Sequence, residues 1–475
     1  DMIAYVDLLL LMAEVKEGVK DAEGAMEDLM SAREKQHEIL ARLRTSEEAN
    51  ALEQRLVAAK LDHRIASRYL VKGDSKEAVT FFTYALERDD SYEPAMLALA
   101  KLYLKQGDLQ KCQHFCGLLM RIDENHEQAA MMLADIMFQK RENEQAVYHF
   151  NQILTKNPVN YRALHRMILL LRRAGKLEEA PKVLDAAEKY SVKTSHDAGL
   201  LFCTGLYLRY TNNVPEAIRA LNKARKNGVW GEQALMHMVE LYLNPESEEM
   251  WEDDGQDTGE AVRVAEKLLR EITRRPKTRE VMVLESYALM CTKQKQNIER
   301  SVQRFVEMVS ADKDYVPAIC GMANALMLLR QVPKARNQLK RIHKMTYNPD
   351  YADDFERGWL MLANIYIGNG KYDLAQDLCK RCLVYNKSCG KAWEHMGLIM
   401  EKESSYRDAA EHYEQAWKCA NKLNAPIGFK LAFNYLKAER FLDAIGVCHS
   451  ILNKFPDYPK IKDEVLKKAR EGLRP

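Results

Sequence analysis

Small residues recur at a fixed interval along the chain, within a pattern of apolar and polar positions that has helical spacing. Four of them follow one another 34 residues apart: Ala78, Cys112, Ala146 and Ala180. After three irregular intervals the spacing returns at three further places: Ser301–Ala335, Ala375–Ala409 and Ala444. A period of this length predicts an array of helical hairpins rather than a domain built around one pocket. Because such arrays usually bind other proteins, surfaces are considered before catalytic groups.

Residues 59–92 illustrate one unit of the array. Two apolar stripes at helical spacing follow one another, namely Ile65, Ala66 and Tyr69 and then Ala78, Phe82 and Ala85. Gly73 lies between them and suits a left-handed residue just after a helix end. Asp74 can cap the second helix, with Glu77 three residues later as in a capping box. The unit is therefore predicted to be helix, tight turn, helix.

This unit resembles the tetratricopeptide repeat, whose first helix carries a large residue, Leu, Gly or Ala, and Tyr, and whose second helix carries Ala, an aromatic residue and Ala. The clearest copies are residues 356–389, with Trp359, Leu362, Ala363, Tyr366, Gly370 and Ala375, and residues 390–423, with Trp393, Gly397, Ala409, Tyr413 and Ala416. About eleven copies fit within residues 59–458, starting near 59, 93, 127, 161, 198, 232, 282, 316, 356, 390 and 425. The resemblance implies an all-α fold, a right-handed α-solenoid or superhelix.

The remaining segments do not fit the repeat. Residues 1–58 are predicted to form one or more atypical helical hairpins that continue from a longer chain, and residues 459–475 a C-terminal capping helix. Residues 244–260 form an acidic insertion, which cannot bury a core. The left-handed turn residues are predicted to be Gly73, Gly107, Gly175, Gly370 and Asn212.

Charge and apolar content limit the classes of partner. With 71 basic and 69 acidic residues, the net charge of +2 gives no field that would recruit nucleic acid or a membrane surface. The longest apolar stretch runs from Val316 to Leu329, which is too short to cross a bilayer and is expected to be a buried first helix. The sequence shows no signal peptide and no lipidation motif.

No motif in the sequence predicts catalysis, a cofactor or a metal. HExxH, Walker A and GxSxG motifs are absent. The cysteine pairs Cys112/Cys116 and Cys379/Cys382 raise the possibility of zinc or redox chemistry, but they occupy packing positions of second helices and lack a further ligand pair. We therefore expect buried reduced thiols, no metal and no enzyme activity.

Two charged segments are candidate protein-binding sites. The acidic insertion contains Trp251, an isolated aromatic residue that could anchor a partner; the alternative is a solvated surface loop. The stretch Tyr315–Pro349 has no acidic residue and carries the second candidate, which is Arg330, Lys334, Arg336, Lys340, Arg341 and Lys344. A basic stripe is often only the solvated face of a helix. The functional alternative is binding of an acidic protein segment, from a neighbouring subunit or from the acidic insertion of this chain folding back.

Several stretches are similar to the C-terminal half of the tetratricopeptide repeat protein 21 family: Tyr5–Met12, Pro94–Ala100, Trp393–Gly397, Phe433–Lys437 and Lys468–Pro475. That family is the large all-repeat subunit of intraflagellar transport complex A. The resemblance implies a non-enzymatic scaffold that binds neighbouring complex A subunits and supports retrograde ciliary transport and cargo trafficking. It also implies a hetero-oligomer in the cytoplasm and cilium, at the axoneme and basal body. The alternative is a scaffold of another large cytosolic assembly, such as a ubiquitin-ligase complex, a vesicle coat or a chaperone adaptor.

Overall fold

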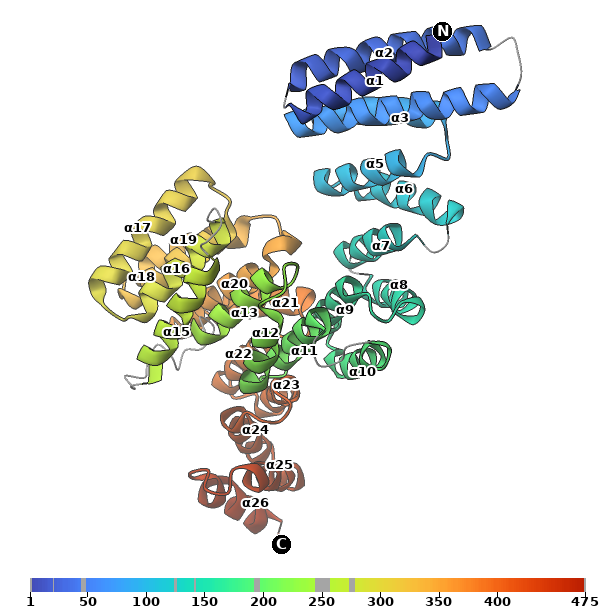
Figure 1. Ribbon diagram of the computed structural model, residues 1–475. Helices are drawn as coiled ribbons and strands as arrows, with labels where there is room; N and C mark the ends of the chain where they lie inside the picture. The colour runs from blue at the N-terminus through green and yellow to red at the C-terminus, as the bar shows by residue number, and fades with distance from the viewer. Residues whose placement is uncertain are drawn as a thin grey trace. The chain divides into compact units, whose positions relative to one another are not determined.

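The computed structural model describes residues 2–19, 21–43, 48–123, 126–140, 142–191, 197–243, 257–272 and 278–473. They divide into two compact units, Asp1–Ile153 and Leu154–Pro475, each of which is a run of helices packed on their neighbours in the sequence (Figure 1). The described residues contain no strand. The predicted all-α solenoid of helical hairpins is therefore confirmed.

The first unit begins with three long helices and continues with shorter pairs. Its helices are α1 (Met2–Gly18), α2 (Ala22–Leu43), α3 (Glu48–Lys72), α4 (Ser75–Arg88), α5 (Glu93–Gln106), α6 (Leu109–Ile122), α7 (Glu127–Gln139) and α8 (Asn143–Lys156), within which the division falls. Helix α3 is continuous through residues 58 and 59, because no Gly or Pro interrupts it before Gly73.

The second unit carries the remaining helices. Its first part consists of α9 (Tyr161–Ala174), η1 (Leu177–Glu179), α10 (Ala180–Tyr190), α11 (Ala198–Tyr210), α12 (Val214–Ala224), α13 (Gly231–Leu243), α15 (Asp257–Ile272), α16 (Arg279–Cys291) and α17 (Lys295–Ala311). The second part consists of α18 (Val316–Leu328), α19 (Val332–Lys344), η2 (Pro349–Tyr351), α20 (Ala352–Gly368), α21 (Tyr372–Tyr385), α22 (Gly390–Lys402), α23 (Tyr406–Cys419), α24 (Ala425–Lys437), α25 (Phe441–Lys454), the π-helical turn η3 (Ile461–Leu466) and α26 (Lys467–Gly472).

The periodic small residues are fully buried where helices pack against one another. Every one of them is 0% exposed: Ala78, Cys112, Ala146, Ala180, Ser301, Ala335, Ala375, Ala409 and Ala444. A short side chain lets two helix backbones cross closely. Larger neighbours such as Phe82 and Phe150, each 1% exposed, fill the space beside the small residues. The polar member, Ser301, donates to the backbone oxygen of Ser286 on the preceding helix at 3.0 Å.

The helix ends follow the predicted turn chemistry. All four predicted glycines have positive φ, from 69° at Gly370 to 87° at Gly73, and Asn212 has φ 61°. The Asp74 side chain accepts the Glu77 N–H, so it caps α4 as expected. Left-handed residues that the sequence did not indicate are Lys293, Arg330, Ser404, Asn421, Lys422, Glu439 and Lys460. All but Lys460, which stands at the start of η3, follow the end of a helix, and none is a glycine that would have marked the turn in the sequence.

Candidate protein-binding surfaces

Helix α19 carries most of the predicted basic residues, and a buried apolar stripe on its other face anchors it. Pro333 stands in its first turn and fixes the entry into the helix. Ala335, Leu339 and Ile342 are each 0% exposed and hold α19 against its neighbours. The exposed and half-buried positions of the helix carry no carboxylate. They carry six basic or imidazole side chains: Lys334, Arg336, Lys340, Arg341, His343 and Lys344.

The structure separates the predicted binding residues rather than gathering them in one patch. At about 100° per residue, Lys334 and Arg341 lie on one flank of the buried stripe. Arg336, Lys340 and Lys344 follow one another at intervals of four along the opposite flank. The predicted residues of α19 therefore lie on two flanks of the helix, and their role in binding stays a prediction.

The individual environments differ as well. Lys334, Lys340 and Lys344 are exposed, as is Arg330 in the turn before α19, where its φ is 59°. Arg341 is half-buried; it donates to the backbone oxygen of Lys313 and lies 3.9 Å from Asp314. The Nε of Arg336, also half-buried, has no hydrogen-bond acceptor in the part of the chain that the structure describes. Trp251 falls outside the described residues.

A groove of about 530 Å³ opens on the flank of α19 that carries Lys334. Helix α17 forms one wall and α19 the other, and α18 forms the floor between them. The lining residues are Glu299, Val302, Gln303, Val306, Met322, Leu326, Leu329, Gln331, Lys334, Asn337 and Gln338. The groove joins an apolar floor to mostly uncharged walls with one lysine. The sequence patterns did not indicate this groove, because its three sides come from three helices of two successive hairpins.

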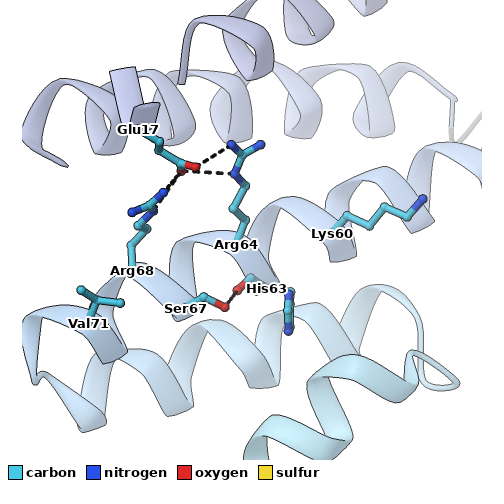
Figure 2. Close-up of a pocket in the computed structure, with 7 residues that line it drawn as sticks. All are labelled: Glu17, Lys60, His63, Arg64, Ser67, Arg68 and Val71. Carbon is cyan, nitrogen blue, oxygen red and sulfur yellow. Dashed lines mark hydrogen bonds and ion pairs between the residues drawn. The ribbon is translucent and has the colours of Figure 1, made fainter. Parts of the chain in front are cut away.

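A second hollow, of about 400 Å³, lies in the first unit between α1 and α3 (Figure 2). Arg64 and Arg68 point toward Glu17, and the Arg64 Nη2 lies 3.0 Å from its carboxylate (Figure 2). Burial tends to raise the pKa of Glu17, but the bonds from Arg64 and Arg68 lower it below its usual value. Ser67 donates to the backbone oxygen of His63 at 2.9 Å. The charges here hold α1 on α3, and the Ser67 hydroxyl is engaged with a backbone oxygen.

Within the second unit, segments some 180 residues apart meet directly. Arg172 and Arg173, at the end of α9, reach Asp353 in the first turn of α20, with N–O distances of 3.3 and 3.5 Å. Arg173 also donates to the Tyr347 hydroxyl at 3.0 Å, and its backbone oxygen accepts the Lys387 N–H at 2.9 Å. We call these five residues the return contact. A solenoid in which each hairpin touched only its neighbours would not contain it.

The return contact is also an electrostatic cluster. Desolvation acts to raise the pKa of Asp353, but Arg172, Arg173 and Arg209 outweigh it and lower that pKa to about 2. Arg209 bonds Glu240 at 2.5 Å, and Arg172 lies over the Tyr210 ring at 4.2 Å. Two carboxylates, Asp353 and Glu240, and three guanidiniums thus form one charged cluster at this contact.

The cysteines are packing residues in this structure. All ten are free thiols, and eight of them are buried. Burial raises the pKa of Cys379 to about 12, so a thiolate there is disfavoured. Among the described residues no three His, Cys, Asp or Glu side chains come together as a metal site would require. None of the described helices has the length and apolarity needed to cross a membrane.

Comparison with known proteins gives the chain a family. Three family models match successive parts of it: the tetratricopeptide repeat protein 21 (TT21) fourth ARM domain at residues 1–86, the fifth ARM repeats domain at 127–243 and the C-terminal ARM domain at 264–470. A general tetratricopeptide repeat model matches residues 70–136. The chain belongs to the tetratricopeptide repeat protein 21 family. The family suggested by the sequence is therefore confirmed.

Named relatives agree with this membership. Mouse tetratricopeptide repeat protein 21A is 43% identical over 100% of the chain, human protein 21B is 44% identical over 98%, and the Caenorhabditis elegans homolog is 30% identical over 99%. The chain spans 37% of the length of the two mammalian relatives and 36% of the nematode one. Among solved structures, the APC/C hetero-tetramer Cut9–Hcn1 matches at a TM-score of 0.43 and 13% identity, over 98% of this chain and 96% of that one.

Proposed function

We propose that this tetratricopeptide repeat protein 21 family member is a non-enzymatic scaffold subunit of intraflagellar transport complex A. In this role it binds neighbouring complex A subunits in a hetero-oligomer, and it supports retrograde transport and ciliary cargo trafficking. It acts in the cytoplasm and the cilium, at the axoneme and basal body. It uses no cofactor, binds no nucleic acid and does not insert into a membrane.

The observation that supports the proposal is the match of three successive family domains along the chain, together with what a hairpin array offers physically. The described helices present a large surface with many side chains that partners can contact. Many weak contacts to neighbours that are themselves held in a polymeric train add up to strong binding through effective concentration. A repeat solenoid is suited to such a role, since its surface grows with each hairpin.

Affinity purification of the tagged full-length protein from ciliated cells, with mass spectrometry of the recovered proteins, tests the proposal. Stoichiometric recovery of the other complex A subunits is expected. Recovery of a different assembly with no ciliary protein would contradict it and favour a ubiquitin-ligase, coat or chaperone-adaptor role.

A matched pair of variants shows whether recovery depends on the solenoid. Ala409 is 0% exposed in α23, and its N–H donates to Ser405 O at 2.9 Å. Ala409→Pro removes that bond and costs about 3 kcal/mol, so the variant should lose the complex. Arg407→Ala, an exposed change in the same helix turn, should retain it.

A further inference from the structure

The groove between α17 and α19 has the form of a seat for a helix. The α17 residues that line it are Glu299, Val302, Gln303 and Val306, which follow the i, i+3, i+4, i+7 spacing of one helix face. They span about 10 Å, or two turns of an α-helix. Because α17 and α19 each run antiparallel to α18, the two walls run in the same direction along the gap between them (Figure 1).

The floor and the walls give the groove an apolar centre. Met322 and Leu326 on α18 are 6% and 7% exposed and close the bottom. Val306, on the α17 wall, is an apolar side chain that remains 46% exposed. Covering Val306 and Val302 would remove apolar surface from water without moving the buried residues beneath.

The charge at the rim specifies the sign of the occupant. Lys334 lines the groove, and Arg330 lies between Leu329 and Gln331, which also line it. Neither cation has an ion-pair partner among the described residues. The one acidic lining residue, Glu299, lies 4.0 Å from Lys295. Three cations, Lys295, Arg330 and Lys334, thus stand in or beside the lining with one carboxylate, so an approaching carboxylate meets a net positive charge.

We propose that this groove binds a short helical segment of a partner protein. The segment would carry apolar side chains at i and i+3 or i+4 for the floor, and a carboxylate for Lys334 and Arg330. The inference rests on the scaffold role proposed above and names the class of partner at this surface. Laying an amphipathic helix into an apolar groove is a recurring mode of peptide recognition, in which apolar anchors give affinity and rim charges give orientation.

The opposite flank of α19 lacks the features that would make it a site. Arg336, Lys340 and Lys344 form a stripe of cations there, but none of them lines the groove. Lys340 therefore provides a control: it has the same charge, lies on the same helix and is also exposed. The comparison of Lys334 with Lys340 separates docking in the groove from general attraction to a basic helix.

The test is fluorescence anisotropy with a designed, fluorescein-labelled 16-residue helical peptide that carries Leu at i, i+3, i+4 and i+7 and Glu on its other face. The full chain is titrated as wild type, Lys334→Glu, Lys340→Glu and Val306→Asp. We expect saturable binding that weakens at least tenfold in Lys334→Glu and Val306→Asp and less than twofold in Lys340→Glu. A peptide with Lys in place of Glu should bind at least tenfold more weakly than the acidic one.

Each other outcome overturns the inference. No saturable binding by the wild type, equal weakening by Lys334→Glu and Lys340→Glu, or no effect of Val306→Asp would each exclude a peptide seat in the groove. Self-association that Val306→Asp abolishes would instead assign the groove to a second copy of the chain. Because the peptide assay uses purified protein, it can fail while complex A subunits are still recovered from cells, so the two proposals fail separately.

Discussion

Replacing Asp353 with Asn tests whether charge holds the return contact closed. The substitution keeps the shape of the side chain in the first turn of α20 and removes its negative charge. Arg172 and Arg173 then lose the carboxylate that lies 3.3 and 3.5 Å from them. The Lys387 N–H reports on closure, because its acceptor is the Arg173 backbone oxygen, 2.9 Å away, and it stands between α21 and α22 rather than inside a helix.

The size of the effect follows from the pKa of Asp353, which falls from 3.8 to about 2 in the folded chain. That shift corresponds to about 2 kcal/mol at 1.36 kcal/mol per unit. The Asp353 side chain is 47% exposed, so solvent screening reduces the usable part to about 1 kcal/mol. A loss of about 1 kcal/mol raises the population of the open form, and with it the exchange rate of the Lys387 amide, about fivefold.

Hydrogen exchange with residue-level mass spectrometry measures this rate at pH 7. Asp350→Asn, an exposed change of the same kind in η2, is the matched control and should leave Lys387 unaffected. High salt should accelerate exchange in the wild type more than in Asp353→Asn, because only the wild type has the ion pairs to screen. Unchanged exchange in Asp353→Asn, or equal acceleration in the control, would show that the ion pairs do not hold the contact.

Two further predictions concern close packing and pH. An alanine Cβ at Gly321 would lie 2.4 Å from the Phe305 ring, whereas one at Gly117 meets nothing within 4 Å. Gly321→Ala should therefore lower the free energy of unfolding by about 1–3 kcal/mol, and Gly117→Ala should raise it by about 0.5–1 kcal/mol. Thermal unfolding measures both changes, and equal effects of the two substitutions would contradict this packing. Burial, with smaller contributions from His237 and Arg166, lowers the pKa of His165 to about 3, so the unfolded chain binds a proton below pH 6.5 that the folded chain does not. The free energy of unfolding should therefore fall as the pH drops from 6.5 toward 3. Between pH 7 and pH 5.5, His165→Phe should lose about 1 kcal/mol less of this free energy than the wild type does, as measured by urea unfolding. Identical losses in the two proteins would refute the assignment.

The hairpins were predictable because their determinants lie close together in the sequence. Gly73 ends one helix and Asp74 caps the next, and Ala78, four residues later, lies where the two helices cross. Arg330 shows where such local signals end. Its left-handed φ of 59° is imposed by the helices on either side, whose bonds from the Arg330 and Gln331 N–H groups to Met327 and Leu326 fix the turn. A long basic side chain gives no indication of that conformation.

The candidate surfaces were only partly predictable, for a geometric reason. The cations of α19 are visible in the sequence as a stretch without carboxylates, but which flank each occupies depends on the direction of Ala335, Leu339 and Ile342. The apolar floor under Lys334 belongs to a different helix, and Val306 to a third. A surface assembled from three helices leaves no contiguous pattern in the sequence. The role of Trp251 stays a prediction, since that residue lies outside the described part of the chain.

A second contact between hairpins that are not adjacent bears on which face of the second unit a partner can use. Helices α16 and α20 are the first helices of hairpins that are not adjacent, yet their side chains meet: Arg357 donates to the Tyr287 hydroxyl at 3.5 Å and lies over its ring at 5.9 Å. Tyr287 is 2% exposed. First helices usually line the concave face of such arrays, so where α16 touches α20 that face is filled by the protein's own side chains. The groove between α17 and α19 lies on the other side of α18, where Val306 is still open to solvent, and a partner can reach it without displacing Arg357 or opening the return contact.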